Sequence, residues 1–416
     1  MTESSNRLLG DAPAAEAMSP KICVVGLGYI GLPTASLLGT KGFEVHGVDT
    51  SPRVVETIRE GRIHIVEPDL DILVKSAVQA GKLTAGPEPV AADVFIIAVP
   101  TPFKNDHQPD LGHVEAATRA IAPMLRPGNL VVLESTVPVG TTDGLIAPIL
   151  RYSGHDLERD VFVAHCPERV LPGRILTELV ANDRIVGGIN SAATQVAVDF
   201  YRSFVRGEVL ATDARTAEMA KLAENAFRDV NIAFANELSI LADREGINVW
   251  ELIALANRHP RVNILSPGPG VGGHCIAVDP WFLVAGAPRI AKLLRVAREV
   301  NDGKPQWVLD KIRASAARFR HPVIGCLGLA FKADVDDVRQ SPAVQIVESL
   351  LEQGVGEVLV AEPNLSTHSR FRLHPYREVI ERADIVVLLV DHRQFRELKA
   401  SDLKEKVLID TRGAIR

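Results

Sequence analysis

The sequence predicts an α/β protein in which two Rossmann-like domains are joined by a long helix and a helical spine. Short apolar runs alternate with helical patterns in the first half of the chain, and this alternation returns near the C-terminus. Between them lies a long helical stretch without Gly or Pro. A chain of 416 residues is also too long for one ordinary core, so two or three domains are expected.

The composition is that of a globular protein, with 46% hydrophobic and 24% charged residues. The net charge of −6 lacks the basic excess that nucleic acid or an anionic membrane selects, so neither is expected as a partner. The sequence contains no apolar run of about 18 residues, so no membrane span is expected. Four widely spaced cysteines show no metal-ligand spacing, which favours free thiols in a cytoplasmic protein and no metal site.

The first α/β domain is expected over residues 21–205, after a polar, Ala-rich extension (1–20) that is typical of disorder and lacks an export-signal core. Its first strand is a short apolar run that ends at a glycine, as a buried parallel strand does. The predicted strands are Ile22–Val25, Phe43–Val48, Val94–Val99, Leu130–Leu133 and Val161–Ala164.

A central helical domain is expected over residues 206–304. It contains one long helix from Ala214 to Glu245, which ends at Gly246, and shorter helices over Trp250–Asn257 and Ala287–Asn301. From about Pro305 a second, smaller Rossmann-like domain is expected to extend to residue 416. Its predicted strands are Val323–Leu327, Val358–Ala361, Ile385–Val390 and Val407–Ile409.

A G-x-G-x-x-G motif follows the first strand and opens a helix, which predicts a dinucleotide site. Gly26 permits the tight turn, Gly28 lets the backbone approach a pyrophosphate, and Gly31 lets helix and strand pack closely. Asp49 ends the second strand, near the spacing expected of a ribose-binding carboxylate. Because an Asp there repels a 2′-phosphate, NAD is favoured over NADP, although the nearby Arg53 weakens that preference.

Hydroxyl groups follow two further strands. Thr101 and Thr136 come just after the strand candidates that begin at Val94 and Leu130. Ligands of an open α/β sheet bind outside the carboxyl ends of its strands, so both residues are placed to meet cofactor or substrate. The alternative for each is helix capping.

A glycine-rich loop delivers the candidate nucleophile. Residues 268–273 contain four glycines, and Cys275 follows at the end of the loop with Asp279 four residues further on. A thiolate can add to an aldehyde and leave later, which suits covalent catalysis. The alternative is an inert buried cysteine, which is the interpretation for Cys23 and Cys326 in their apolar strands.

The long helix supplies possible partners for this thiol. Lys221, Asn225 and Arg228 share one helix face, either as a solvated polar stripe or as a buried set that a sugar hydroxyl or oxyanion would satisfy. Glu168 and Arg169 follow another strand, where Glu168 is a candidate general base or else a surface charge.

Two basic segments remain. Arg258-His259-Pro260-Arg261 is a cluster suited to a diphosphate or a sugar substituent. In the C-terminal domain, Gly325 to Lys332 follows a strand as a second nucleotide-cradling turn, with Lys332 near phosphate and Arg339 beyond it.

Seven motifs together resemble the UDP-glucose/GDP-mannose dehydrogenase family, over nearly the whole chain from Lys21 onward. They are GLGYIGLP, AVPTP, ESTVPVG, CPERV, AEMAKLAENAFRDVNIAFANE, PGPGVGGHCIAVDPW and GLAFKADVDDVRQSP. Within the family, EPDL at 67–70, TPFK at 101–104 and the segment NRHPRVNILSPGPGVGGHCIAVDPWF are similar to the branch that acts on UDP-N-acetyl-D-mannosamine.

The resemblance implies an NAD domain, a helical dimerisation spine and a UDP-binding domain. It implies a four-electron oxidation of the C6 hydroxymethyl group to a carboxylate through a thiohemiacetal and a thioester on Cys275, supplying a uronic acid for a surface polysaccharide. Lys221, with Asn225 beside it, would stabilise oxyanions or shuttle protons. Asp279 would assist through water or Lys221, and Glu168 would activate the hydrolytic water.

The same resemblance implies the ligand contacts. Beside the glycine turn and Arg53, NAD would meet Tyr29, Ile30, Asp49, Thr101, Thr136 and Arg339. The UDP-sugar would meet Arg169, Val170, Lys221, Asn225, Arg228, His259, Arg261, Gly272 and Lys332. A homodimer, or a dimer of dimers, is implied, with Arg261 reaching the partner's site.

Alternatives remain open on sequence grounds. Within the family, UDP-N-acetylglucosamine and UDP-glucose are other possible substrates, because a few side chains can distinguish an epimeric hydroxyl or an acetamido group. A two-electron hydroxyacid or 6-phosphogluconate dehydrogenase would not need the thiol. A non-catalytic nucleotide-sugar binding protein would need neither Cys275 nor Lys221, and both are present.

Overall fold

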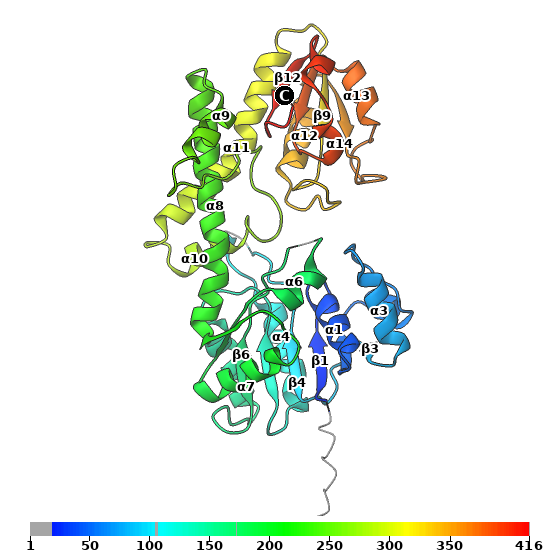
Figure 1. The fold of residues 1–416 in the computed structure, drawn as a ribbon, viewed down its shortest axis with the longest axis vertical. Coiled ribbons are helices and arrows are strands. Elements are labelled where there is room, and N and C mark those ends of the chain that lie inside the picture. Colours follow the sequence, from blue (N-terminus) through cyan, green and yellow to red (C-terminus); the bar gives the residue numbers. More distant parts are fainter. Residues whose placement is uncertain (1–18, 105–106, 172, 416) are drawn as a thin grey trace, which may run out of the picture.

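The computed structural model describes residues 19–104, 107–171 and 173–415. The expected extension therefore lies, apart from its last two residues, outside the described residues. Two α/β units stand one above the other beside a long helix (Figure 1). The predicted architecture of two Rossmann-like units joined by a helical segment is confirmed. Among the described residues, no helix combines the length and the apolarity that crossing a membrane requires.

The N-terminal unit is built on a sheet of eight strands in the order β3-β2-β1-β4-β5-β6-β7-β8. Neighbouring strands are parallel except β6 and β7, which pair antiparallel. The strands are β1 (Lys21–Val25), β2 (Glu44–Val48), β3 (Leu83–Gly86), β4 (Val94–Ile97), β5 (Leu130–Leu133), β6 (Phe162–His165), β7 (Arg184–Gly188) and β8 (Val209–Asp213).

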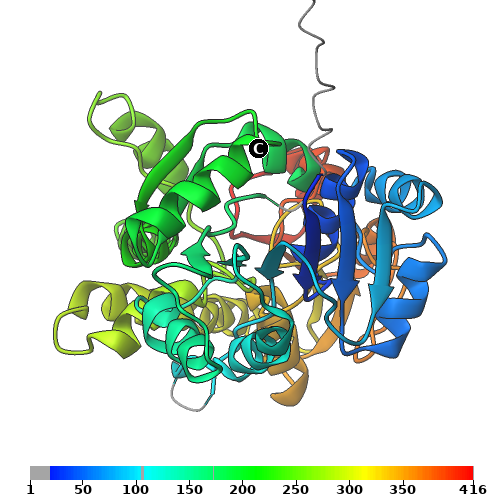
Figure 2. The same ribbon diagram turned by 90° about the horizontal axis from the view of Figure 1, so that it is seen from below.

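Helices cover both faces of this sheet (Figure 2). In β1, Ile22 and Val24 belong to the hydrophobic core on one face, whereas Cys23 and Val25 belong to the core on the other. A strand with two buried faces needs apolar residues at every position, as this run has. The helices are α1 (Gly31–Thr40), α2 (Pro52–Arg59), α3 (Leu70–Gln79), α4 (Gly112–Ile121), α5 (Ala147–Tyr152), α6 (Ile175–Ala181) and α7 (Ser191–Arg202).

The predicted long helix is confirmed as α8 (Ala214–Arg244), a helix of 31 residues. The Asp213 side chain caps it by accepting from the backbone N–H of Thr216, and Gly246, with φ of 69°, follows its end. The helix expected over Trp250–Asn257 is α9 (Val249–Ala256). A further helix, α10 (Asp279–Gly286), begins where the sequence predicted loop, with Pro280 in its first turn.

The helix expected over Ala287–Asn301 was wrong in both bounds. It is α11 (Lys292–Ala316), and it runs through Pro305, which had been taken as the start of the next domain. An interior proline costs a helix about 3 kcal/mol. Burial of Val308, Leu309 and Ile312 in the core of the C-terminal unit offsets that cost.

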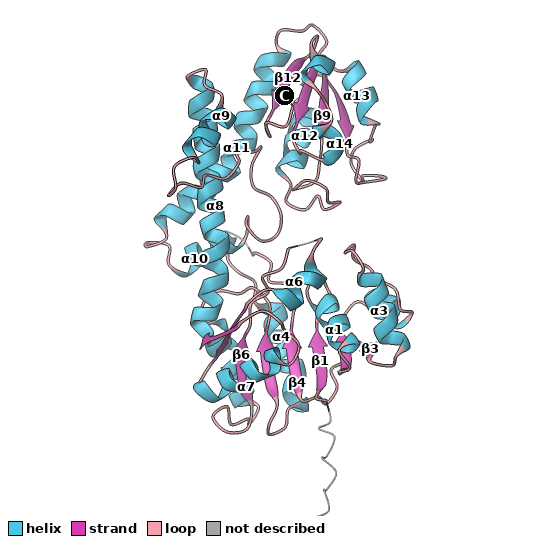
Figure 3. Ribbon diagram, in the orientation of Figure 1, coloured by secondary structure: helices cyan, strands magenta, loops and turns pink. Residues whose placement is uncertain are grey.

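The C-terminal unit has a parallel sheet in the order β10-β9-β11-β12. Its elements are β9 (Val323–Leu327), α12 (Pro342–Glu352), β10 (Glu357–Ala361), α13 (Tyr376–Arg382), β11 (Ile385–Leu388), α14 (Arg393–Arg396) and β12 (Val407–Asp410). All four strands were predicted. The loops that follow β1, β4, β5 and β6 of the N-terminal unit, and those that follow the strands of the C-terminal unit, extend toward the middle of the molecule (Figure 3).

Buried polar groups join α8 to α11 and so set the spacing of the two units. Asp229 on α8 accepts hydrogen bonds from Arg298 at 2.6 Å and Asn301 at 2.8 Å on α11. The side chains of Arg298 and Asp229 are 1% and 0% exposed. Asn301 also accepts from Asn236 of α8 at 2.9 Å. A buried ion pair of this kind contributes register, because either partner alone would be an uncompensated charge.

Asp229→Ala should therefore lower the free energy of unfolding by about 3–5 kcal/mol, because Arg298 would stay buried without its partner. Asp302→Ala is the matched control. Asp302 pairs with the same arginine but has a 48% exposed side chain, so its loss should cost about 0.5 kcal/mol or less. Urea unfolding followed by circular dichroism measures both. Equal losses in the two variants would contradict the importance of the buried pair.

Candidate active site

The turn after β1 has the geometry that the glycine motif predicts. Gly26 has φ of 95°, and a Cβ on Gly31 would lie 1.8 Å from the Gly26 carbonyl oxygen. A Cβ on Gly28 would meet nothing within 4 Å, so the space above this residue is open to a ligand. Ile30 is the N-cap residue of α1. The turn thus presents open backbone at a helix N-terminus, which fits a pyrophosphate.

Asp49 stands at the end of β2 beside this turn. Its carboxylate accepts from the backbone N–H of Leu27 at 3.1 Å and of Ser51 at 2.9 Å, and the residue stays partly exposed. A cavity of about 430 Å³ nearby is lined by Arg53 and His64, among others. The carboxylate and the adjoining space fit the adenosine ribose of a dinucleotide.

The loops after β4 and β5 are tied together by hydroxyl groups. The Thr101 hydroxyl donates to the carbonyl of Thr136 at 2.7 Å, and Ser135 donates to the carbonyl of Val99 at 2.7 Å. Neither predicted threonine caps a helix among the described elements. Because its proton is engaged, the Thr101 hydroxyl can still accept a hydrogen bond from a ligand, but it cannot also donate one.

The glycine-rich loop owes its composition to the C-terminal unit. A Cβ on Gly272 would lie 2.5 Å from the Gln340 carbonyl oxygen, and one on Gly273 would lie 2.9 Å from the Phe331 ring. The loop is therefore pressed against the segment after β9, where side chains have no room. Cys275 comes next and is exposed, whereas the other three cysteines are buried.

Cys275 is surrounded by charges from three parts of the chain. Desolvation raises the pKa of its thiol to about 11, and the Asp279 carboxylate adds to this, while Lys221, Arg339 and Arg228 oppose it. A thiol with this pKa is protonated at neutral pH, so nucleophilic attack needs a nearby base.

Asp279 has the properties of such a base. Burial raises the pKa of its carboxyl to about 6, against the lowering effects of Lys221 and of a hydrogen bond from Asn225. The Asn225 amide donates to Asp279 at 2.5 Å, so helix α8 holds the carboxylate in place. The structure thus brings Lys221, Asn225, Asp279 and Cys275 together, as the sequence predicted.

Residues from all three parts of the chain meet at Tyr29. The Arg339 guanidinium lies 5.0 Å from the centroid of the Tyr29 ring, and the centroid of the His274 ring lies 6.4 Å from it. Arg339 Nη2 also lies 3.3 Å from His274 Nδ1, and an ion pair with Asp337 at 2.6 Å holds the arginine. The carboxyl ends of β1 and β9 therefore face each other, with the Cys275 loop between them.

Two further cations point to an anion site. Burial and the charge of Arg228 lower the pKa of Lys332, while Glu67 and Glu178 oppose this effect. Arg228 comes from α8 and Lys332 from the segment after β9. Since a diphosphate would relieve the repulsion between these cations, both fit the predicted UDP contacts.

Glu168, the candidate general base, is buried and held by internal contacts. One of its oxygens accepts from the backbone N–H of Arg169 at 2.6 Å, and the other pairs with Arg184 at 3.0 Å. Neither hydrogen bond reaches the Cys275 loop. The Arg169 guanidinium pairs with Glu224 of α8 at 2.7 Å and so anchors the loop after β6, in which Val170 packs against the core.

His259 and Arg261 lie in the loop after α9 and are both exposed. Within the described chain they hydrogen-bond to each other, from the Arg261 N–H to His259 Nδ1, and to none of the site residues. A single chain therefore does not bring these two residues to Cys275.

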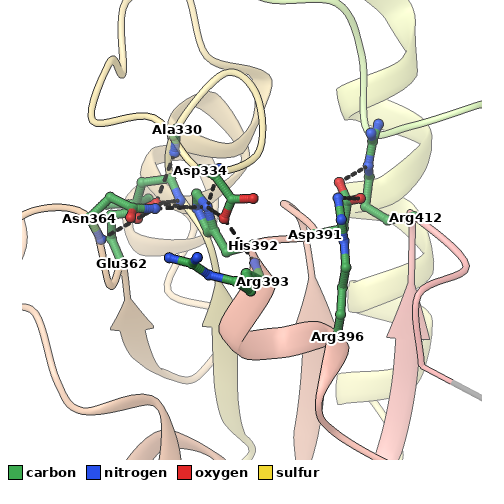
Figure 4. A network of polar contacts seen from close by, with 10 residues as sticks. Ala330, Asp334, Glu362, Asn364, Asp391, His392, Arg393, Arg396 and Arg412 are labelled. Atoms are coloured by element: carbon green, nitrogen blue, oxygen red, sulfur yellow. Dashed lines mark hydrogen bonds and ion pairs between the residues drawn. The ribbon is translucent and has the colours of Figure 1, made fainter. Parts of the chain in front are cut away.

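The second glycine turn, after β9, differs from the first in its acid. Glu362 ends β10 and accepts from the backbone N–H groups of Leu329 at 2.7 Å and Ala330 at 3.0 Å. It also accepts from His392 at 2.9 Å, and its side chain is 0% exposed (Figure 4). Because its oxygens are used internally, this turn has no carboxylate to offer a ribose.

Three models of one family match successive parts of the chain. They describe the NAD binding, central and UDP binding domains of the UDP-glucose/GDP-mannose dehydrogenase family, and they match residues 20–205, 215–303 and 325–416. An NDP-N-acetyl-D-galactosaminuronic acid dehydrogenase of Ralstonia nicotianae is 59% identical over 94% of the chain and 95% of its own length. The chain belongs to this family. It is an NAD-dependent nucleotide-sugar dehydrogenase.

Other family members are also similar. A UDP-N-acetyl-D-mannosamine dehydrogenase of Yersinia pestis is 52% identical over 95% of the chain and 99% of its own length. The solved structure of a UDP-N-acetyl-mannosamine dehydrogenase from S. aureus has a TM-score of 0.88 and 43% identity, over 95% of this chain and 96% of that one. The predicted family, enzyme class and cofactor are thus confirmed.

Sequence reasoning missed two buried charged residues, Arg184 and Glu67, that fix the loop between β6 and α6. Arg184 pairs with Glu168, and Glu67 accepts from the backbone N–H groups of Gly173 and Ile175, both at 2.8 Å. Glu67 lay in a quoted motif without a role. Its carboxylate joins the segment before α3 to the start of α6, more than 100 residues later, a contact that no local pattern signals.

Alkylation of the folded enzyme by iodoacetamide should label Cys275 first, because the other cysteines are buried. Since the thiol pKa is about 11, the labelling rate should rise about tenfold per pH unit between pH 7 and 9. Lys221→Met should slow labelling, because a positive charge that favours the thiolate is lost. Lys292→Met, at an exposed position, is the control. Mass spectrometry of the labelled peptides gives the rates, and a pH-independent rate would contradict the raised pKa.

Proposed function

We propose that the enzyme oxidises UDP-N-acetyl-D-mannosamine at C6 to UDP-N-acetyl-D-mannosaminuronate, a uronic acid precursor for surface polysaccharide. The observation that carries the four-electron chemistry is the exposed Cys275 beside Lys221 and the Asn225–Asp279 pair. A two-electron alcohol oxidation needs no nucleophile at that place.

In the proposed mechanism, NAD, when bound, accepts a hydride in each of two oxidations. Asp279 receives the proton of the C6 hydroxyl in the first, directly or through Lys221. Asp279 then loses that proton to solvent. Cys275 Sγ adds to the C6 aldehyde, its own proton passing to the freed carboxylate, and so retains the aldehyde as a thiohemiacetal. Lys221 and Asn225 stabilise the oxyanion. The second oxidation gives a thioester, and water activated by Glu168 releases the carboxylate.

The ligand contacts follow from the same arrangement. The turn at Gly26–Gly31, with Asp49, would hold NAD. Arg228 and Lys332 would hold the diphosphate, because their charges already oppose each other across the site. The three successive segments of the chain would thus serve as NAD domain, helical spine and UDP-sugar domain.

The named relatives support two candidate substrates, which differ in the sugar. The Y. pestis and S. aureus relatives, named for UDP-N-acetyl-mannosamine, support the proposed substrate. The R. nicotianae relative, named for N-acetyl-D-galactosaminuronic acid, is more similar in sequence and supports an N-acetylgalactosamine nucleotide as second candidate. Both sugars carry an acetamido group at C2, and they differ in configuration at C2 and C4.

The decisive measurement is NADH formed per sugar consumed, by absorbance, with UDP-N-acetyl-D-mannosamine, UDP-N-acetyl-D-galactosamine, UDP-N-acetyl-D-glucosamine and UDP-glucose. Two NADH per molecule of the first sugar, with higher kcat/KM than for the others, is expected. The same ratio with another sugar would keep the mechanism and replace the substrate. One NADH per sugar would contradict the four-electron chemistry. Cys275→Ser should abolish turnover to the acid, and full turnover in that variant would contradict the nucleophile.

We also propose that the enzyme is a homodimer whose interface includes an exposed apolar stripe on α8. Phe227, Phe234 and Leu241 recur every seven residues, and they are 68%, 51% and 50% exposed. Such a spacing places the three side chains on one helix face, as in helices that pair with another helix. Large exposed apolar side chains in a row are typical of an interface. His259 and Arg261, which meet no site residue in one chain, would then reach the partner's site.

Phe234→Glu should convert the dimer to a monomer, because a charge would be buried at the centre of the stripe. Sedimentation equilibrium measures the mass, and Leu351→Glu, at an exposed apolar residue on α12, is the control. A wild-type chain that sediments as a monomer would contradict the proposal. If Arg261 serves the partner, the Phe234→Glu monomer should also show a raised KM for the UDP-sugar.

A further inference from the structure

Glu168 belongs to a buried cluster of ionisable groups that also contains Arg184, Glu134 and Tyr201. The Glu168–Arg184 ion pair has a length of 3.0 Å, with side chains 5% and 3% exposed. Glu134, the residue that follows β5, is 1% exposed and accepts a hydrogen bond from the Tyr201 hydroxyl of α7 at 2.7 Å. The charge of Arg184 acts on both Glu134 and Glu168. Two buried carboxyl groups thus lie in the field of one guanidinium, and Glu168 is the one paired with it.

The hydrogen bonding of the cluster is incomplete. Arg184 Nε, which is buried, has no hydrogen-bond partner among the described residues, and Glu134 Oε2 has none beyond the nearby Thr34 hydroxyl, which lowers the pKa of that carboxyl. Buried polar atoms are nearly always paired, and exceptions mark places where a group is strained or has a second arrangement. Arg184 therefore has an unused donor while it is paired with Glu168.

We propose that Glu134 is a positioning residue that controls, through the shared Arg184, when Glu168 is released to activate the water that hydrolyses the Cys275 thioester. This inference rests on the proposed function, in which Glu168 is that base. While Glu134 is neutral, Arg184 serves Glu168 alone and holds it in the interior. Once Glu134 is ionised, two carboxylates compete for one cation, and Glu168 can leave.

Glu134 titrates in the range that such a device needs. Burial raises the pKa of Glu134 to about 7, and the neighbouring Glu168 contributes, while Arg184 and Tyr201 lower it. Since the folded-state pKa lies above the ordinary value, Glu134 is neutral below about pH 7 and ionised above it. The release of Glu168 should therefore increase as the pH rises through 7.

The other titratable groups that face Glu134 hold their charge state over this range. Burial raises the pKa of Cys166 to about 12 and raises that of Tyr201 well above its ordinary value. His165, next along β6, has its pKa lowered to about 3 by burial and stays neutral. Arg184 stays protonated beside its carboxylates. None of Cys166, Tyr201, His165 and Arg184 therefore changes charge near pH 7.

The step itself is a hydrolysis without redox change. The water oxygen bonds to the thioester carbonyl carbon, one water proton passes to Glu168, and the carbon–sulfur bond breaks. Cys275 leaves as the thiolate and takes up the proton held by Glu168, and the second water proton is released when the product ionises to the sugar carboxylate. Glu134 touches none of the reacting atoms, so its effect should fall on this step and leave both oxidations unchanged.

The test follows the covalent adduct on Cys275 in single turnovers of the full enzyme with NAD and the UDP-sugar, by acid quench and intact mass spectrometry. In the wild type, the rate of adduct loss should rise about tenfold from pH 6 to pH 8, as expected for one group that titrates near 7. In Glu134→Gln the rate should stay at the pH 6 level throughout, with the rate of adduct formation unchanged.

Tyr201→Phe provides a second variant with a different expected result. It removes the hydroxyl that lowers the pKa of Glu134, so the midpoint of the pH dependence should move to higher pH while its amplitude stays. A merely structural role of either residue would lower stability without moving this midpoint. Should Glu134→Gln fail to fold, an unchanged midpoint in Tyr201→Phe would by itself overturn the proposal.

The failure of this inference differs from that of the proposed function. Two NADH per sugar with the wild-type pH profile retained in Glu134→Gln would overturn the role of Glu134 alone. A wild-type enzyme that forms no adduct on Cys275 and gives fewer than two NADH would overturn the proposed function, and this inference with it.

Discussion

The site depends on the close packing of the glycine-rich loop against the segment after β9. Gly272 and Gly273 lie where any side chain would meet Gln340 or Phe331, so the loop approaches the C-terminal unit to backbone distance. That approach sets Cys275 between a turn that fits NAD and cations that fit a diphosphate. It requires a fixed spacing of the two α/β units, which the buried contacts of Asp229 and Asn236 between α8 and α11 supply. The packing of α8 against α11, at a distance from Cys275, thus determines the position of its thiol.

Desolvation is the second constraint. It raises the pKa of both Cys275 and Asp279, with opposite consequences for their reactivity. It raises the pKa of Cys275 to about 11, which keeps the thiol protonated, and that of Asp279 to about 6, which makes the carboxylate a better base. A thiol that stays protonated at rest is protected from unwanted oxidation and alkylation. In the proposed mechanism, reaction then requires proton transfer to Asp279 at the moment an aldehyde is present, which would link nucleophilic attack to the oxidation that precedes it.

Features encoded in short segments could be predicted, and those that depend on distant partners could not. The turn at Gly26 and the acid at Asp49 follow from strand, turn and helix signals within one βαβ unit. The end of the predicted helix before Pro305 was wrong because the local rule for proline was outweighed by burial of the helix that contains it. The role of Arg184 could not be predicted, because it depends on an ion pair between this first residue of β7 and Glu168 in the loop after β6. Glu134 is bonded to a tyrosine 67 residues away, a pairing that only the folded chain creates.

The two glycine turns show how one local pattern serves two purposes. Both place an acid at the end of the adjacent strand, where it accepts from backbone N–H groups of the turn. Asp49 stays partly exposed, whereas Glu362 is enclosed by His392, and Asn364 also donates to it. Closing the second carboxylate removes a ribose contact but stiffens the segment that begins at Leu329. That segment carries Phe331, Lys332 and Arg339, and its residues Phe331 and Gln340 lie directly against the glycine-rich loop that precedes Cys275.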